Sequence, residues 1–81
     1  MPKHNVVIGP RRLALRYARR RGWLPEDVIV VTSHHELHMI DPPLIKRIIV
    51  LGRRVIGAML HEIQALRRLW PIRVVQVPAP A

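Results

Sequence analysis

The chain has 81 residues and carries 14 Lys and Arg against 5 Asp and Glu, a formal net charge of +9, with no cysteine. A chain of this length forms one domain, the absence of cysteine excludes disulfides and thiolate metal sites, and no apolar run approaches the ~20 residues that span a bilayer. The first residues, MPKHNVVIGPRR, lack the apolar stretch and cleavage site of a signal peptide. We therefore expect a cytoplasmic protein that does not enter a membrane.

The first elements in chain order are a short apolar segment, a helix and a strand. Residues 5–9 form either a strand or an apolar anchor. Residues 9–23 predict a helix, because Pro10 stands near its first turn and Gly22 stands where a C-terminal cap belongs. Residues 27–32 contain a run of consecutive apolar residues that are mostly β-branched, which is typical of a strand buried on both faces.

The second half of the chain repeats this alternation. Residues 33–40 predict a short helix that stops at the sequence DPP, because a residue before proline disfavours the helical region. A second strand follows at 45–52, the longest helix at Arg53–Leu69, and a third strand at 72–77.

Strands that alternate with helices predict an α/β fold. We expect a small open sheet of three or four mainly parallel strands with flanking helices, in the order helix, strand, short helix, strand, long helix, strand. The strand at 72–77 alternates apolar residues with Arg73 and Gln76, so it should be half exposed, at an edge of the sheet. Residues 1–77 then form a single domain, and 78–81 a disordered Pro/Ala tail.

The segment SHHELH, which begins at Ser33, holds three of the five histidines. Ser33 and Glu36 have the spacing of a capping box, in which the hydroxyl accepts a free backbone N–H and the carboxylate reaches back. The alternative is a metal site, since His34 and His38 lie on one face of a helical turn. No third ligand has a usual spacing, and the segment is one residue short of the zinc-protease motif. We predict a capped helix start, with no metal, no cofactor, no catalytic residue and no enzymatic activity.

The end of the second strand is a candidate anion site. In open parallel sheets ligands bind beyond the carboxyl ends of the strands, and Gly52, Arg53 and Arg54 stand there, at the predicted start of the long helix. Two arginines in a first turn oppose the helix dipole, and a bound anion would relieve that cost. The segment lacks the Lys-Ser/Thr of a P-loop and the three-glycine dinucleotide fingerprint.

The first helix carries an arginine stripe. At ~100° per residue, one face of this helix presents Arg12, Arg16, Arg19 and Arg20. Only Lys3 and Lys46 are lysines, so 12 of the 14 basic residues are arginines. The planar guanidinium group of arginine binds phosphate with two parallel hydrogen bonds, which the lysine ammonium group cannot do. The stripe either tracks a phosphate backbone or is a solvated face, enriched in arginine by the codon usage of a GC-rich genome.

The long helix is apolar over more of its circumference than one sheet requires. Its only acid, Glu62, falls inside the apolar arc and should be paired, with an arginine as the expected partner. Together with the predicted edge strand, this excess predicts a homo-oligomer, a dimer in the simplest case. We place the interface on Met59, Leu60, Glu62 and Ile63.

Residues 13–54, half of the chain, resemble in pattern the short α/β orphan proteins encoded by actinobacterial phages. The shared features are an Ala/Arg helix that ends in Gly-Trp, a strand, a short crossover, and a strand that ends in glycine. The resemblance implies a small accessory protein that binds nucleic acid or a host protein, and it carries over no site residue.

Three functions are therefore open. The first is the binding of nucleic acid or another polyanion through the arginine stripe and the Gly52–Arg54 segment. The alternative is a protein-interaction module, which modulates a host or partner protein through the apolar long helix or a sheet edge. A third is a small ligand binder or enzyme at the strand ends.

Overall fold

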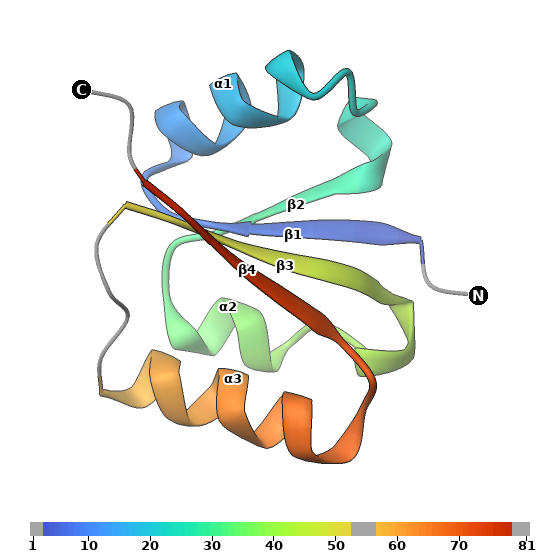
Figure 1. The fold of residues 1–81 in the computed structure, drawn as a ribbon, viewed down its shortest axis with the longest axis vertical. Coiled ribbons are helices and arrows are strands. Elements are labelled where there is room, and N and C mark those ends of the chain that lie inside the picture. Colours follow the sequence, from blue (N-terminus) through green and yellow to red (C-terminus); the bar gives the residue numbers. More distant parts are fainter. Residues whose placement is uncertain (1–2, 53–56, 79–81) are drawn as a thin grey trace.

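The computed structural model describes residues 3–52 and 57–78, which form an α/β fold with a four-stranded, all-parallel sheet between two layers of helices (Figure 1). The predicted fold class is confirmed. In chain order the elements are β1 (His4–Ile8), α1 (Arg11–Arg20), the 3₁₀ helix η1 (Pro25–Asp27), β2 (Val28–Val31), α2 (His34–His38), the 3₁₀ helix η2 (Pro42–Leu44), β3 (Ile45–Leu51), α3 (Ala58–Leu69) and β4 (Arg73–Val77).

The strand order is β2-β1-β3-β4. Helix α1 lies on one face of the sheet, and α2 and α3 lie on the other (Figure 1). Strand β2 is therefore added on one side of β1, and β3 and β4 are added on the other side. The strand order reverses between β1 and β3, and β2 and β4 are the edge strands. The ambiguous segment at 5–9 contributes a central strand, and the edge position predicted for residues 72–77 is confirmed.

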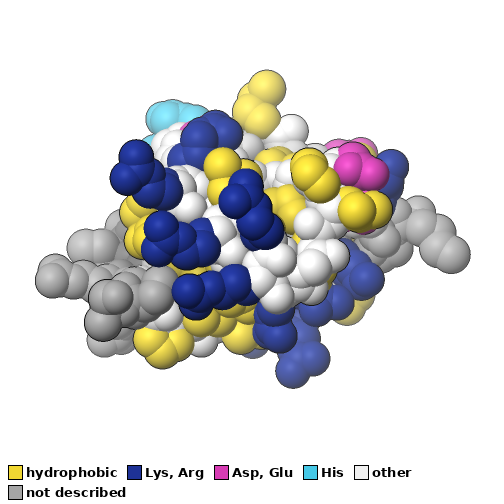
Figure 2. All heavy atoms as spheres, turned by 90° about the horizontal axis from the view of Figure 1, so that it is seen from above, with side chains coloured by type: hydrophobic (Ala, Val, Ile, Leu, Met, Phe, Trp, Pro, Cys, Tyr) yellow, Lys and Arg dark blue, Asp and Glu magenta, His cyan; other side chains and the backbone are white. Residues whose placement is uncertain are grey.

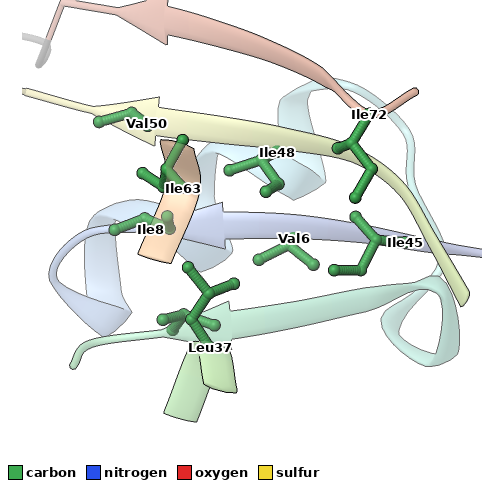
Figure 3. Packing of buried hydrophobic residues seen from close by; sticks show 9 residues of the cluster. Val6, Ile8, Leu37, Ile45, Ile48, Val50, Ile63 and Ile72 are labelled. Atoms are coloured by element: carbon green, nitrogen blue, oxygen red, sulfur yellow. The ribbon is translucent and has the colours of Figure 1, made fainter. Parts of the chain in front are cut away.

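The main core lies between the sheet and the α2/α3 layer (Figure 3). It consists of Val6, Ile8, Val31, Leu37, Ile45, Ile48, Val50, Ile63 and Ile72. The pairing of β1 with β3 shifts by one residue between His4 and Asn5, so that Lys46 of β3 has no register partner on β1 and forms a bulge. Because of this bulge, Ile45 and Ile48 both enter the same core although they are three residues apart.

A second core lies under α1. The buried side chains of this core are Val7, Ala14, Ile49 and Leu51. Alanine at positions 14 and 18 lets the helix backbone approach the sheet closely. Gly22 adopts φ 73° after the helix, and the N–H of Trp23 donates to the carbonyl of Ala18 at 3.1 Å. This geometry is a glycine C-terminal cap, which confirms the cap predicted at Gly22.

Helix α3 begins later than the sequence predicts. Gly57 precedes Ala58 with φ 68°, a left-handed conformation that interrupts a right-handed helix, so the predicted start at Arg53 is wrong. Arg53 and Arg54 lie outside the described residues, as do residues 79–81 of the predicted tail.

Helix α2 has the predicted serine cap. The Ser33 hydroxyl accepts the N–H of Glu36 at 3.4 Å. The Glu36 carboxylate reaches back one residue further than a capping box requires. It accepts the N–H of Thr32 at 3.3 Å and also the Thr32 hydroxyl. The segment SHHE therefore acts as a helix start.

Replacing Ser33 with alanine should lower the free energy of unfolding by about 1 kcal/mol, because the N–H of Glu36 loses its acceptor. Urea denaturation followed by circular dichroism measures this change. Ser33→Asp, which restores an acceptor, is the control and should recover most of the loss. Equal losses in both variants would contradict a capping role for the Ser33 hydroxyl.

The pKa of Glu36 is lowered from its ordinary value, mainly by the hydrogen bond from the Thr32 hydroxyl. The folded protein thus holds the Glu36 proton less tightly than the unfolded chain does. The resulting stabilisation is present above the pKa of the unfolded chain and is lost as the pH falls through the lowered pKa of the folded state. Glu36→Gln and Thr32→Val should each flatten the acid limb of a plot of unfolding free energy against pH. An unchanged limb in both variants would contradict this assignment.

Candidate nucleic-acid interface

The sheet face that α1 covers carries a dense group of basic side chains. Arg11, Arg12, Arg16, Arg19 and Arg20 are all exposed on this helix. Looking down on the α1 side, Figure 2 shows Lys and Arg side chains spread over most of the face, hydrophobic side chains between them and acidic side chains at one edge. The α1 stripe of Arg12, Arg16, Arg19 and Arg20, which we call the arginine stripe, is therefore brought together as predicted.

The arginine stripe is not flat. Arg12, Arg16 and Arg19 surround Leu15 in an open hollow of about 400 Å³, and Leu15 is 46% exposed. The rest of the helix faces inward through Ala14 and Ala18. The outer side of α1 therefore presents three guanidinium groups around one exposed apolar side chain, that of Leu15.

Two arginines of the sheet extend the basic face beyond α1. The Arg47 guanidinium lies 5.6 Å from the centre of the Trp23 ring, a cation–π distance. Arg73 is the register partner of Arg47, and register partners in a parallel sheet point to the same face. Sequence reasoning missed both residues, because their facing depends on the bulge at Lys46 and on the pairing of β3 with β4.

The arginine stripe has no carboxylate within ion-pair distance in the part of the chain that the structure describes. The ion pair found among those residues joins His38 Nδ1 to a Glu62 carboxylate oxygen at 3.3 Å, between α2 and α3 on the other face. Positive charge on the α1 face is therefore not neutralised by neighbouring side chains of the described residues.

Of the second predicted anion site, only Gly52 lies among the described residues. Gly52 follows β3 with φ 85°, its N–H donates to the carbonyl of Val77 at 2.9 Å, and its own carbonyl accepts the Gln76 side-chain amide at 2.8 Å. Gly52 thus anchors the end of β4.

The point at which the strand order reverses lies at the carboxyl ends of β1 and β3. A Cβ atom on Gly9 would lie 3.1 Å from Leu51 Cβ, so the two strand ends approach each other closely. Sequence reasoning did not identify this position because residues 5–9 were not assigned to a strand. The signal was available as a repeat, since VVIGPRR and IIVLGRR both run from an apolar strand through glycine to two arginines.

The three histidines of α2 do not converge. The rings of His34 and His35 lie with their centres 3.9 Å apart and their planes tilted by 37°, while His38 contacts Glu62. In the described ranges, no group of three His, Asp or Glu side chains is placed to hold a metal ion.

The four residues predicted for an interface have different environments. Ile63 is buried in the protein's own core and is not available to a partner. Met59 is half-buried against that core, and Leu60 is exposed. Glu62 is half-buried, and its contact in the described chain is His38 rather than the expected arginine. The large apolar side chains that α3 leaves exposed are Leu60 and Leu69, which point to different sides of the helix.

Comparison of the sequence with protein families and with curated proteins, and of the fold with solved structures, found no match. None of the helices within residues 3–52 and 57–78 has the length and apolar character needed to cross a bilayer.

Proposed function

We propose that the protein binds nucleic acid, or another polyanion, through the arginine stripe of α1. The observation that supports this proposal is the set of four exposed guanidinium groups without a carboxylate partner among the described residues. A ten-residue helix is about 15 Å long, a length over which duplex DNA presents several phosphates. Guanidinium groups pair with phosphate oxygens in a forked geometry. Such contacts bind the backbone without reading the base sequence.

The test is a salt titration of binding to a labelled, random-sequence DNA duplex. Affinity should fall linearly on a logarithmic salt scale, because each neutralised phosphate releases counterions. Arg16→Ala and Arg19→Ala should each weaken binding equally for all sequences and reduce the slope by about 1. Arg68→Ala is the matched control, since Arg68 is an exposed arginine of α3 on the opposite layer.

Two results would contradict the proposal. In the first, Arg68→Ala weakens binding as much as Arg16→Ala does, which is the behaviour of a diffuse positive charge. In the second, no binding of the unmodified protein is left at a physiological ionic strength of about 0.15 M.

A protein-interaction module is the second candidate, and the observation that favours it is the edge strand β4. Val74, Val75 and Val77 are half-buried, so the strand leaves apolar surface open on both of its faces. An edge strand also presents unpaired backbone N–H and C=O groups to a further strand. We propose a second copy of the chain as the partner.

A further inference from the structure

A groove at the carboxyl end of the sheet lies beside the arginine stripe and shares Arg16 and Arg20 with it. It is an open groove between α1 and the last residues of two strands, Leu51 of β3 and Val77 of β4, and has a volume of about 210 Å³. Leu51 and Val77 are register partners and therefore point to the same face. The groove thus lies at the carboxyl end of the sheet, the end at which open α/β sheets bind ligands.

The lining of the groove combines apolar side chains with positive charge. Leu13, Tyr17, Leu51 and Val77 line it together with Arg16 and Arg20, which are one helical turn apart. Neither arginine has a carboxylate within ion-pair distance among the described residues. The occupant that complements this lining has a compact apolar group joined to an anion.

The ring of Tyr17 is held in place before any ligand arrives. Arg21 Nε donates to the Tyr17 hydroxyl at 3.1 Å. The Trp23 ring also meets the Tyr17 ring edge to face, with their centres 5.7 Å apart. Little side-chain entropy is then lost when an apolar group packs against Tyr17.

The size of the groove limits the apolar group. Its volume of about 210 Å³ is below the ~300–1,000 Å³ of pockets for drug-sized ligands, so neither a dinucleotide nor a lipid chain fits inside. One planar ring system does. Two guanidinium groups one turn apart suit a phosphate dianion better than a single carboxylate, because each can give a forked pair of hydrogen bonds.

We infer that this groove binds one nucleoside phosphate, with the base against Tyr17, Leu13 and Val77 and the phosphate between Arg16 and Arg20. The nucleotide is either free or the phosphorylated end of a strand, since both present the same chemistry. The inference goes beyond the proposed duplex binding, with which the groove shares Arg16 and Arg20, because it adds an apolar lining that receives a base.

The experiment titrates the full chain with AMP, with inorganic phosphate and with a 5′-phosphorylated single-stranded oligonucleotide, at constant ionic strength. Binding is followed by Trp23 fluorescence in a Trp70→Phe background and by backbone amide shifts in NMR. AMP should bind about tenfold more tightly than inorganic phosphate, because the base adds its stacking contacts. The shifts should concentrate on Leu13, Tyr17, Leu51 and Val77. Tighter binding of the oligonucleotide than of AMP would identify a strand end as the source of the nucleotide, and the reverse a free nucleotide.

Two variants separate this groove from the duplex surface. Val77→Phe fills the groove without changing charge and should weaken AMP binding about tenfold, with duplex binding within twofold of the unmodified protein. Arg19→Ala should do the opposite. The inference is overturned if AMP binds no more tightly than inorganic phosphate. It is also overturned if the amide shifts of the unmodified protein fall on Arg12 and Arg19, a result that does not depend on the folding of any variant.

Discussion

Replacing Ile48 with alanine should lower the free energy of unfolding by about 2–5 kcal/mol. Ile48 is 0% exposed and occupies the centre of the main core (Figure 3). Its neighbours across the sheet are Val6 on β1 and Val74 on β4. None of these short, β-branched side chains can move far enough to fill the cavity that the truncation leaves. A domain of this size has a total stability on the order of 4–12 kcal/mol, so the loss is a large part of it.

The measurement is urea denaturation followed by circular dichroism, with Leu69→Ala as the matched control. Leu69 is an aliphatic residue of α3 that is 77% exposed, and its truncation should change the stability by no more than about 0.5 kcal/mol. Equal small losses in the two variants would show that the face between the sheet and the α2/α3 layer is not close-packed.

The second large effect concerns self-association through β4. Light scattering at micromolar concentration should give a mass of about twice the 9.4 kDa of the chain. An antiparallel pairing of two β4 strands centred on Val75 sets Val75 opposite its own copy and Arg73 opposite Val77, so that no two arginines face each other. Val75→Lys should return the mass to that of one chain, because two lysines would then stand side by side.

The control for this prediction is the other edge of the sheet. Val30 of β2 is also half-buried on the α1 side, and Val30→Lys should leave the dimer intact. Dissociation by Val30→Lys alone would assign the contact to β2. A mass of 9.4 kDa for the unmodified protein would refute self-association.

Such a dimer would bring the two arginine stripes to one side of the joined sheet. Antiparallel pairing of two edge strands places the two-fold axis perpendicular to the sheet, so both copies of α1 lie on the same side. The two arginine stripes would then face one polyanion together. Val75→Lys should therefore weaken duplex binding although it adds positive charge.

The sequence predicted those parts of the fold that depend on local pattern. Consecutive β-branched residues identified β2 and β3, and the caps at Ser33 and Gly22 bounded two helices correctly. The central position of β1 was not predicted, because a five-residue apolar segment does not specify its neighbours. The start of α3 was wrong because the apolar pattern continues across Gly57, whose left-handed conformation interrupts the helix.

Among the candidate sites, too, only those that depend on local sequence pattern could be predicted. The arginine stripe follows from the helical repeat alone and could be predicted. The groove at Val77 and the pairing of His38 with Glu62 could not, since each joins segments whose approach is fixed only by the strand order and by the packing of α2 on α3. Glu62 was expected to need a partner, and only the packing shows which residue supplies it.

The central place of β1 has a consequence for how the chain folds during synthesis. Strand β1 leaves the ribosome before its two neighbours, β2 and β3, and its partner at Ile48 is made some forty residues later. Until β3 emerges, β1 can pair only with β2, which leaves Val6 and Val7 with an open edge. Long-range parallel pairing of this kind is slow and exposes apolar surface to aggregation. We therefore expect nascent chains that stop before β3 to depend on chaperones, and the chain to fold cooperatively once β3 is complete.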